Sequence, residues 1–110
     1  MNSLRNALES NNSAHFLKPF DARRMPNYAA FRDQVEEFFR RYDAFIVRYQ
    51  VTQISMDGEF GTLTANFAFD AKPSDGVTPN VQKNVLLRLV LAWDGKQWRV
   101  VDLSPRTWLL

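Results

Sequence analysis

The sequence contains no cysteine and a single histidine, His15, in 110 residues. The absence of cysteine excludes disulfides, thiolate catalysis and cysteine-based metal sites, and it leaves the redox compartment open. One histidine excludes a metal site with two histidine ligands, and the carboxylates show no spacing typical of a site built from them alone. The sequence therefore predicts no metal ion and no cofactor.

The sequence also lacks a glycine-rich segment and a long apolar run. Its four glycines are isolated, so a phosphate-binding loop is not predicted. No apolar run approaches the ~18–20 residues that a membrane span requires. The N-terminus lacks the basic and then apolar pattern of a signal peptide. We expect a soluble protein of bacterial type, either cytoplasmic or extracytoplasmic after removal of a leader.

The sequence also lacks a large excess of positive or negative charge. Fourteen basic and twelve acidic residues leave a net charge of +2. The basic doublets, Arg23-Arg24 and Arg40-Arg41, are far apart in the sequence, whereas a protein that reads nucleic acid normally carries a clustered basic face. We therefore predict no nucleic-acid partner.

Hydrophobic side chains, in contrast, are plentiful. They make up 45% of the chain, and aromatic residues make up 14%, which is enough for a single domain over 1–110 with an aromatic-rich core. Residues 3–25 are predicted to form two short helical pieces separated by Asn11-Asn12. Both pieces are too short to be stable alone, so they must pack on a larger element.

The clearest helix is predicted over 27–43, with Asn27 as its N-cap. Apolar residues recur along it at three- and four-residue steps: Tyr28, Phe31, Val35, Phe38, Phe39 and Tyr42. The other side is charged. Glu36 precedes Arg40 by four residues, and Glu37 precedes Arg41 by four, the spacing of helical ion pairs. This pattern is typical of a helix with one side buried on a sheet and the other in solvent.

From residue 45 onward the hydrophobic period changes to two, which predicts strands. The expected strands are 45–55, 59–70, 82–93 and 97–103, with a loop over 71–81. A three-residue loop at 56–58 would pair Val51 with Leu63, Val47 with Phe67 and Phe45 with Phe69, and so join apolar residues to apolar residues. A two-residue turn would pair Val51 with Thr64 instead.

The last two strands are predicted to meet at a two-residue turn, Asp94-Gly95. This turn places Leu91 opposite Trp98, Leu89 opposite Val100 and Leu87 opposite Asp102 on the core face. The other face mixes apolar residues with two arginines: Leu86, Arg88, Val90, Arg99 and Val101. A half-apolar sheet face is often covered by another subunit, so we predict a homodimer through it. The alternative is an ordinary surface with scattered apolar residues.

This order of helices and strands resembles the nuclear transport factor 2-like (NTF2-like) superfamily, which includes ketosteroid isomerase and the SnoaL-like proteins. The residues that carry the likeness are Phe31-Arg32-Asp33-Gln34-Val35-Glu36-Glu37-Phe38-Phe39 and the ending Trp93-Asp94-Gly95-Lys96-Gln97-Trp98-Arg99-Val100-Val101-Asp102-Leu103. The resemblance implies an α+β, cystatin-like cone: N-terminal helices packed on a curved four-stranded antiparallel sheet, with a pocket inside and a dimer surface outside.

The sequence departs from this family in two places. The short strand that the family places between its second and third helices has little room between Phe20 and Asn27. The isomerases carry a general-base aspartate near that region and a tyrosine in the first helix, whereas the first helices here contain no tyrosine and only His15. Isomerase activity is therefore not carried over.

Asp102 and His15 are the candidate catalytic residues. A carboxylate on the apolar core face would be harder to ionise, which is how proteins make general acids and bases. Alternatively, Asp102 lies at a strand end and is solvated or paired with an arginine such as Arg106. His15 is either a base oriented by Asp102 or a partly exposed helix residue.

Six aromatic residues are candidates for the wall of an apolar ligand pocket: Tyr28, Phe31, Tyr49, Phe67, Phe69 and Trp93. The same side chains could fill the core completely, because a short chain has less material with which to hold a cone open.

Three functions remain compatible with the sequence. The favoured one is a non-catalytic module that binds a small apolar ligand or self-associates through its sheet. The second is an isomerase, dehydratase or cyclase that uses Asp102 on a small hydrophobic substrate. The third is a domain that docks onto a partner protein.

Overall fold

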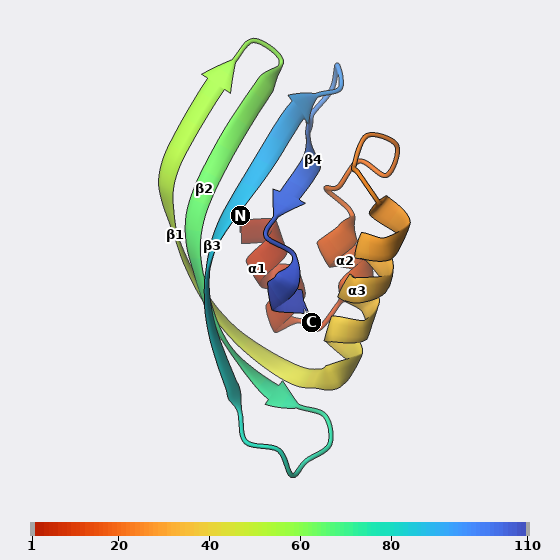
Figure 1. Ribbon diagram of the computed structural model, residues 1–110, viewed down its shortest axis with the longest axis vertical. Coiled ribbons are helices and arrows are strands. Elements are labelled where there is room, and N and C mark those ends of the chain that lie inside the picture. The colour runs from red at the N-terminus through yellow and green to blue at the C-terminus, as the bar shows by residue number, and fades with distance from the viewer. Residues whose placement is uncertain (1, 110) are drawn as a thin grey trace.

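The computed structural model describes residues 2–109, with side chains from Leu4 onward. Their elements are α1 (Asn2–Glu9), α2 (Ser13–Leu17), α3 (Tyr28–Arg41), β1 (Tyr42–Asp57), β2 (Phe60–Pro73), β3 (Val81–Trp93), β4 (Trp98–Ser104) and the 3₁₀ helix η1 (Thr107–Leu109). The strands form one antiparallel sheet in the order β1-β2-β3-β4. The sheet is curved and the helices lie on its concave side (Figure 1). The expected α+β architecture is confirmed.

Helix α3 starts where the sequence predicts. Its apolar side is buried, as expected, through Phe31, Val35, Phe38 and Phe39. Asn27 precedes it at φ 52°, in the left-handed region, and its side chain makes no capping hydrogen bond. The helix ends at Arg41, two residues earlier than expected, because the backbone becomes extended at Tyr42 and enters β1. No helix within residues 2–109 is long and apolar enough to cross a bilayer.

The charged side of α3 differs from expectation at its C-terminal end. Glu37 pairs with Arg40 at 3.2 Å, not with Arg41. Arg41 instead donates to the backbone oxygen of Leu109, and its guanidinium carbon lies 5.8 Å from the centre of the Phe38 ring. Glu36 lies 3.7 Å from Arg32. The expected Glu36–Arg40 and Glu37–Arg41 pairs are therefore wrong, because Arg40 pairs with Glu37 and Arg41 lies against η1.

The expected pairing of β1 with β2 is wrong by two residues. Val47 lies opposite Phe69 rather than Phe67, and Phe45 lies opposite Ala71. Because side chains in a strand alternate with a period of two, a shift of two residues leaves each side chain on its expected face. Phe45, Val47, Phe67 and Phe69 are accordingly all buried on the concave face.

The shift arises from a different turn and a bulge. The turn consists of Gly58 and Glu59, and Gly58 has φ 61°, a left-handed value that glycine adopts without strain. Thr52 then bulges, so that the pairing of Gln53 with Thr64 gives way to that of Val51 with Ala65. Hydrophobic patterning does not encode such a bulge.

The turn between β3 and β4 also differs from the expected one. Trp93 lies opposite Trp98 and Leu91 opposite Val100, because the backbone N–H of Asp94 donates to the oxygen of Gln97 at 3.1 Å. The central turn residues are therefore Gly95, at φ 98°, and Lys96. The expected Asp94-Gly95 turn is therefore wrong by one position along the chain. Moving the turn by one position shifts the pairing of the two strands by two residues, so the side chains near the turn keep their expected faces.

A second bulge, at Val101, changes the faces farther along β4. After it, Asp102 lies opposite Val90, and Leu103 lies opposite Leu89. Leu103 is 1% exposed, so it takes the core position that the sequence assigned to Asp102. The expected place of Asp102 opposite Leu87 is wrong because the bulge shifts the strand by one residue.

The space between the helices and the concave face is filled by aromatic rings around Trp108. The Trp108 side chain, 5% exposed, contacts rings from α2, α3 and β2, with centroid distances from 5.4 to 6.5 Å. These rings are Phe16, Phe38, Phe67 and Phe69. Every buried side chain among the described residues is hydrophobic. Thus η1 closes the interior of the cone with the chain's own indole.

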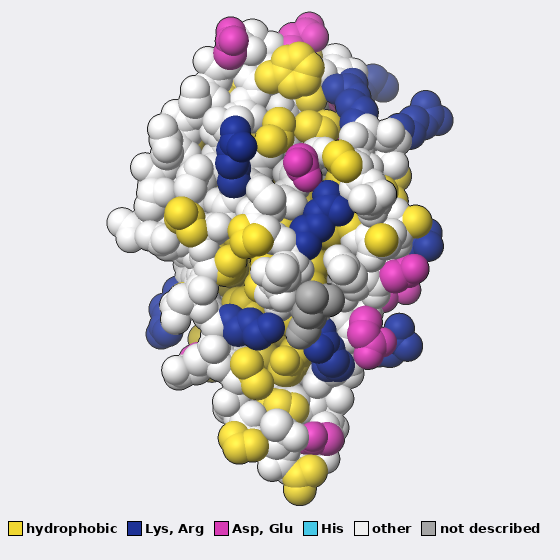
Figure 2. Space-filling view, viewed as in Figure 1, with side chains coloured by type: hydrophobic (Ala, Val, Ile, Leu, Met, Phe, Trp, Pro, Cys, Tyr) yellow, Lys and Arg dark blue, Asp and Glu magenta, His cyan; other side chains and the backbone are white. Residues whose placement is uncertain are grey.

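The turns of the β1–β2 and β3–β4 hairpins extend beyond the helices (Figure 1). Their concave side carries exposed hydrophobic residues, among them Ile54, Met56, Trp93 and Trp98. Figure 2 shows hydrophobic side chains exposed at this upper end of the molecule. The apolar interior therefore continues into a solvent-exposed surface next to the start of β4.

Candidate functional site

A groove lies between α1, α2 and the start of β4. It has a volume of about 590 Å³, within the range of small-molecule sites. Its lining residues are Asn6, Ala7, Ser10, His15, Lys18, Pro19, Gln97, Trp98 and Arg99. Three separate segments of the sequence thus form one concave surface.

The helical wall is positioned by a tight connection between α1 and α2. The backbone N–H of Asn12 donates to the oxygen of Ala7 at 2.9 Å. The Asn12 side-chain oxygen accepts from the backbone N–H of His15 at 3.0 Å and so caps α2. Asn11, at φ 54°, supplies the left-handed residue between the helices. These contacts bring His15 to the same side as α1.

The opposite wall is the free edge of β4. The N–H of Val100 donates to Pro19 O at 2.9 Å, and Val100 O accepts from Asp21 N–H at 2.8 Å. Phe20 therefore forms a single parallel bridge with Val100, in the region where the sequence left little room for a strand. Backbone groups two residues apart point to the same edge of a strand, so the amide of Trp98 faces the groove.

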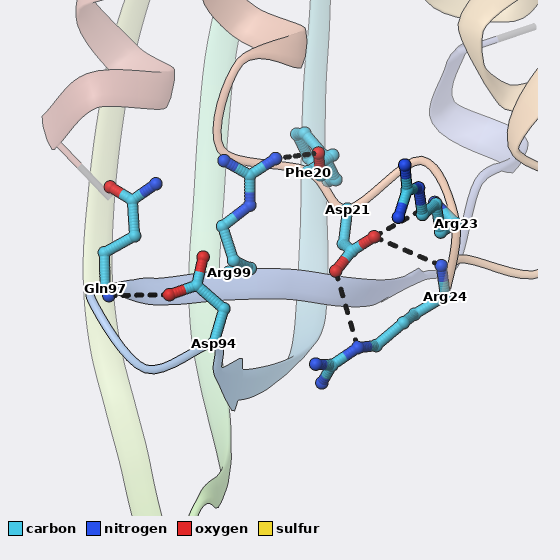
Figure 3. A network of polar contacts seen from close by, with 7 residues as sticks. All are labelled: Phe20, Asp21, Arg23, Arg24, Asp94, Gln97 and Arg99. Carbon is cyan, nitrogen blue, oxygen red and sulfur yellow. Dashed lines mark hydrogen bonds and ion pairs between the residues drawn. The ribbon is translucent and has the colours of Figure 1, made fainter.

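A polar network fixes the start of β4 (Figure 3). Arg99 donates from Nη2 to the backbone oxygen of Phe20 at 2.8 Å. Asp21 accepts from the backbone N–H groups of Arg23 and Arg24 at 3.0 and 3.2 Å, and its second oxygen lies 3.5 Å from Arg24 Nε. The Arg99 side chain thereby joins the strand to the segment that forms its neighbouring edge.

The β3–β4 turn is held by Asp94. Its carboxylate accepts from the backbone N–H groups of Gln97 and Lys96 at 2.9 and 2.8 Å. These two bonds, that from Gln97 first, hold the pKa of Asp94 below its usual value, and the charges of Arg99 and Arg24 act in the same direction. Asp94 is thus an anion that orients the turn from which Gln97 reaches the groove.

The charges that line the groove have one sign. Lys18 and Arg99 are cationic, and no aspartate or glutamate is among the lining residues. Lys18 is exposed and has no carboxylate within 4.0 Å among the described residues. Trp98, at 38% exposure, supplies the aromatic surface. The groove therefore combines an apolar wall with basic groups.

Asp102 lies outside this groove. Its Oδ1 accepts from Arg106 Nη2 at 3.1 Å and from the backbone N–H of Leu103 at 2.9 Å. Arg106 in turn lies over the ring of Phe31, with its guanidinium carbon 5.1 Å from the centroid. No described hydrogen bond or ion pair joins Asp102 to His15. The structure does not bring the two candidate catalytic residues together.

The six aromatic residues proposed for a pocket wall also separate. Phe31, Phe67 and Phe69 are buried in the ring cluster, and Tyr28 and Tyr49 are half-buried beside the core. Trp93 is 36% exposed and contacts Trp98, with ring centroids 5.6 Å apart. None of the six lines the groove.

The residues proposed for a dimer face lie mostly together. The register places Leu86, Arg88 and Val90 on the convex face, with Arg99 opposite Ala92 on the same side. Leu86 is 55% exposed and Arg88 is exposed, whereas Val101 sits in the bulge. The helices leave this face uncovered (Figure 1).

The contact between Lys83 and Trp108 was not predicted from the sequence. Lys83 Nζ donates to the backbone oxygen of Trp108 at 2.8 Å. Burial, and secondarily the charge of Arg41, lowers the pKa of Lys83. Lys83 shares its face of β3 with Val81, Val85 and Leu87, which was the available signal that it faces inward. Among residues 2–109 no group of three or more metal-binding side chains is placed to hold an ion.

No protein-family model and no curated protein matches the sequence. Solved structures match in fold. Bd1075 of Bdellovibrio bacteriovorus has a TM-score of 0.75 and 11% identity over 94% of this chain, which spans 37% of that protein. An NTF2-like superfamily protein from Salmonella enterica serovar Typhimurium has a TM-score of 0.78 and 10% identity over 93% of this chain and 81% of its own.

A third match is a protein of the NTF2-like family from Streptomyces avermitilis, to which a dehydratase activity is ascribed. It has a TM-score of 0.74 and 12% identity, and the match covers 93% of this chain and 87% of that one. At such identities the likeness shows the fold alone. The chain therefore has the NTF2-like, cystatin-like fold, and the resemblance inferred from its sequence is confirmed at that level.

Proposed function

We propose that this chain is a non-catalytic binding domain that holds a small apolar ligand in the groove beside β4, and not inside the cone. The observation that carries the proposal is the position of Trp108. Its side chain and four phenylalanine rings occupy the space between the helices and the sheet. The groove, with its exposed Trp98, is an open concave surface beside this filled interior.

The separation of the titratable groups supports a binding role over a catalytic one. General acid–base chemistry requires a group with a suitable pKa within reach of the substrate and a second group that orients it. Asp102 is held by Arg106 on one side of the sheet, and His15 lies in the groove without it. A catalytic use of the groove would draw on His15 and Lys18, with no carboxylate among the lining residues to orient them.

Replacing Trp98 with alanine is expected to weaken the binding of 1-naphthol about tenfold, which corresponds to about 1.4 kcal/mol. The indole contributes apolar area and an aromatic face to the ligand. The control is Phe60→Ala, because Phe60 is an exposed aromatic residue, at 58%, that does not line the groove. NMR chemical-shift titration of the labelled protein measures both affinities and locates the ligand.

Shifts confined to Ala7, His15 and Trp98 would support the groove as the site. Shifts centred on Phe69 and Trp108 would place the ligand inside the cone and contradict the proposal, as would the absence of any saturable shift. Turnover of a substrate that is lost in His15→Gln would instead support the catalytic alternative.

Self-association through the convex face is a second candidate, favoured by the exposure of Leu86 at 55%, beside Arg88 on β3, and of Ile46 at 63%, two strands away on β1. These side chains share a face that no helix covers (Figure 1). Exposed apolar residues on a sheet face that nothing covers are compatible with a protein interface. The proposed contact is between two copies of this face, related by a two-fold axis.

Arg88→Glu is expected to convert the dimer to a monomer while unfolding stays cooperative, because it would bury an unpaired carboxylate at the contact. Arg40→Glu, on the exposed side of α3, is the control and is expected to leave the mass unchanged. Sedimentation equilibrium measures both. A wild-type monomer, or a dimer insensitive to Arg88→Glu, would argue against this interface.

A further inference from the structure

We propose that the ligand of the groove is a small aromatic carboxylate, with its ring against Trp98 and its anionic group near Lys18. This inference rests on the proposed function, because it names the class of ligand for the same groove. It is argued from the charge of the lining, the hydrogen-bonding groups at the β4 edge and the position of the aromatic surface.

The first argument is charge complementarity. The two permanently charged side chains that line the groove, Lys18 and Arg99, are both cationic, and no carboxylate lines it. Lys18 has no acidic partner within 4.0 Å among the described residues. A bound anion would provide the opposite charge that Lys18 lacks among the described residues.

The second argument concerns the nearest acidic residues. Asp21 is occupied by the backbone N–H groups of Arg23 and Arg24 and by the Arg24 guanidinium. Asp94 accepts two backbone N–H groups of its own turn. Asp94 offsets part of the charge of Arg99, and Arg99 already donates to Phe20. Lys18 is therefore the principal cation that remains for a ligand.

The third argument is the arrangement of donors. Pro19 O binds the N–H of Val100, so Lys18, the preceding residue, lies beside the same edge of β4. The backbone N–H of Trp98 points to that edge, because it is two residues from Val100. A carboxylate has two oxygens that each accept hydrogen bonds. One oxygen can bind the Lys18 ammonium and the other the Trp98 amide.

The fourth argument is the apolar end. Ala7 and Trp98 line the groove, and the Trp98 ring continues into Trp93. A flat ring is the shape that offset or edge contacts with an indole favour. The volume of about 590 Å³ accommodates a fused two- or three-ring body. The groove thus pairs an aromatic surface at one end with a cation at the other.

The test compares three naphthalene probes of equal shape: 2-naphthoate, 2-naphthalenemethanol and 2-naphthylmethylammonium. Isothermal titration calorimetry on the intact chain is expected to show 2-naphthoate binding at least about tenfold tighter than the neutral alcohol, and the ammonium binding weakest. Lys18→Gln is expected to remove most of this preference without changing the affinity for the alcohol. Lys72→Gln, an equal change of charge on the exposed part of β2, is the control.

Salt gives an independent readout. Raising the ionic strength from about 0.05 M to about 0.5 M is expected to weaken the binding of 2-naphthoate severalfold, because exposed charge pairs are screened. The affinity for the alcohol is expected to stay unchanged. Equal affinities for naphthoate and the alcohol would overturn the inference while the proposed function stands. A naphthoate preference that survives Lys18→Gln would overturn it as well. Failure of all three probes to bind would overturn the proposed function.

Discussion

Trp108→Ala is expected to lower the free energy of unfolding by about 3–5 kcal/mol, the range for removing a large aromatic side chain from a core. Trp108 is 5% exposed and contacts four phenylalanine rings. Its removal leaves a cavity that the surrounding helices and strands can only partly close. Urea denaturation followed by circular dichroism measures the change without relying on tryptophan fluorescence.

Two further variants show that the effect comes from packing at this position. Trp98→Ala removes an identical side chain that is 38% exposed, and it is expected to cost less than about 1 kcal/mol. Trp108→Phe keeps a ring and removes an indole N–H that is buried without an acceptor among the described residues. The free energy of unfolding of Trp108→Phe is expected to lie closer to that of the wild type than the value for Trp108→Ala does. Equal costs for Trp98→Ala and Trp108→Ala would show that the interior is not closed by η1.

Leu87→Asp is expected to prevent folding altogether. The Leu87 side chain is 1% exposed on the concave face, and a buried carboxylate without a partner costs several kcal/mol, comparable with the ~5–15 kcal/mol that stabilises a whole domain. Its neighbour Leu86 points to the opposite face and is 55% exposed. Leu86→Asp is therefore expected to change stability by less than about 0.5 kcal/mol.

Circular dichroism and the dispersion of the amide NMR spectrum distinguish the two variants. The same substitution at adjacent positions changes composition equally, so only the direction of the side chain differs. A folded Leu87→Asp protein, or an unfolded Leu86→Asp protein, would mean that the faces of β3 are assigned the wrong way round. Leu86→Asp also lies on the proposed dimer face, so its mass is measured alongside its stability.

The parts of the fold that could be predicted are those that periodicity determines. The apolar steps from Phe31 to Phe39 indicate which side of α3 is buried, and the structure buries that side. The alternation in β3 separates Leu86 from Leu87 correctly. Errors of two residues in both hairpin registers had no effect on these faces because the strand period is two.

The parts that could not be predicted depend on single-residue irregularities. The bulge at Val101 moves Asp102 away from Leu87 and puts Leu103 in the core. One extra residue in a strand changes no hydrophobic count, so patterning cannot reveal it. The role of Trp108 was missed for a related reason. The stretch after Pro105 is too short to show a period, and its burial depends on where rings from α2, α3 and β2 meet.

The groove was hidden from the sequence because it exists only in three dimensions. Ala7, Lys18 and Trp98 come from three separate segments, and no spacing in the chain relates them. The contact of Pro19 with Val100 brings the segments together. Sequence patterns identify faces within one element more readily than surfaces shared between elements.

The Trp108 indole fills the cone, and the ligand is therefore proposed to bind in the groove beside β4. Nuclear Overhauser effects from the Trp108 ring protons test this filling. The structure predicts strong cross-peaks from this ring to Phe38 and Phe69, whose centroids lie 5.4 and 5.8 Å away. It also predicts an indole N–H that exchanges with water far more slowly than that of Trp98. Absence of these cross-peaks, together with equal exchange of the two indoles, would contradict the account.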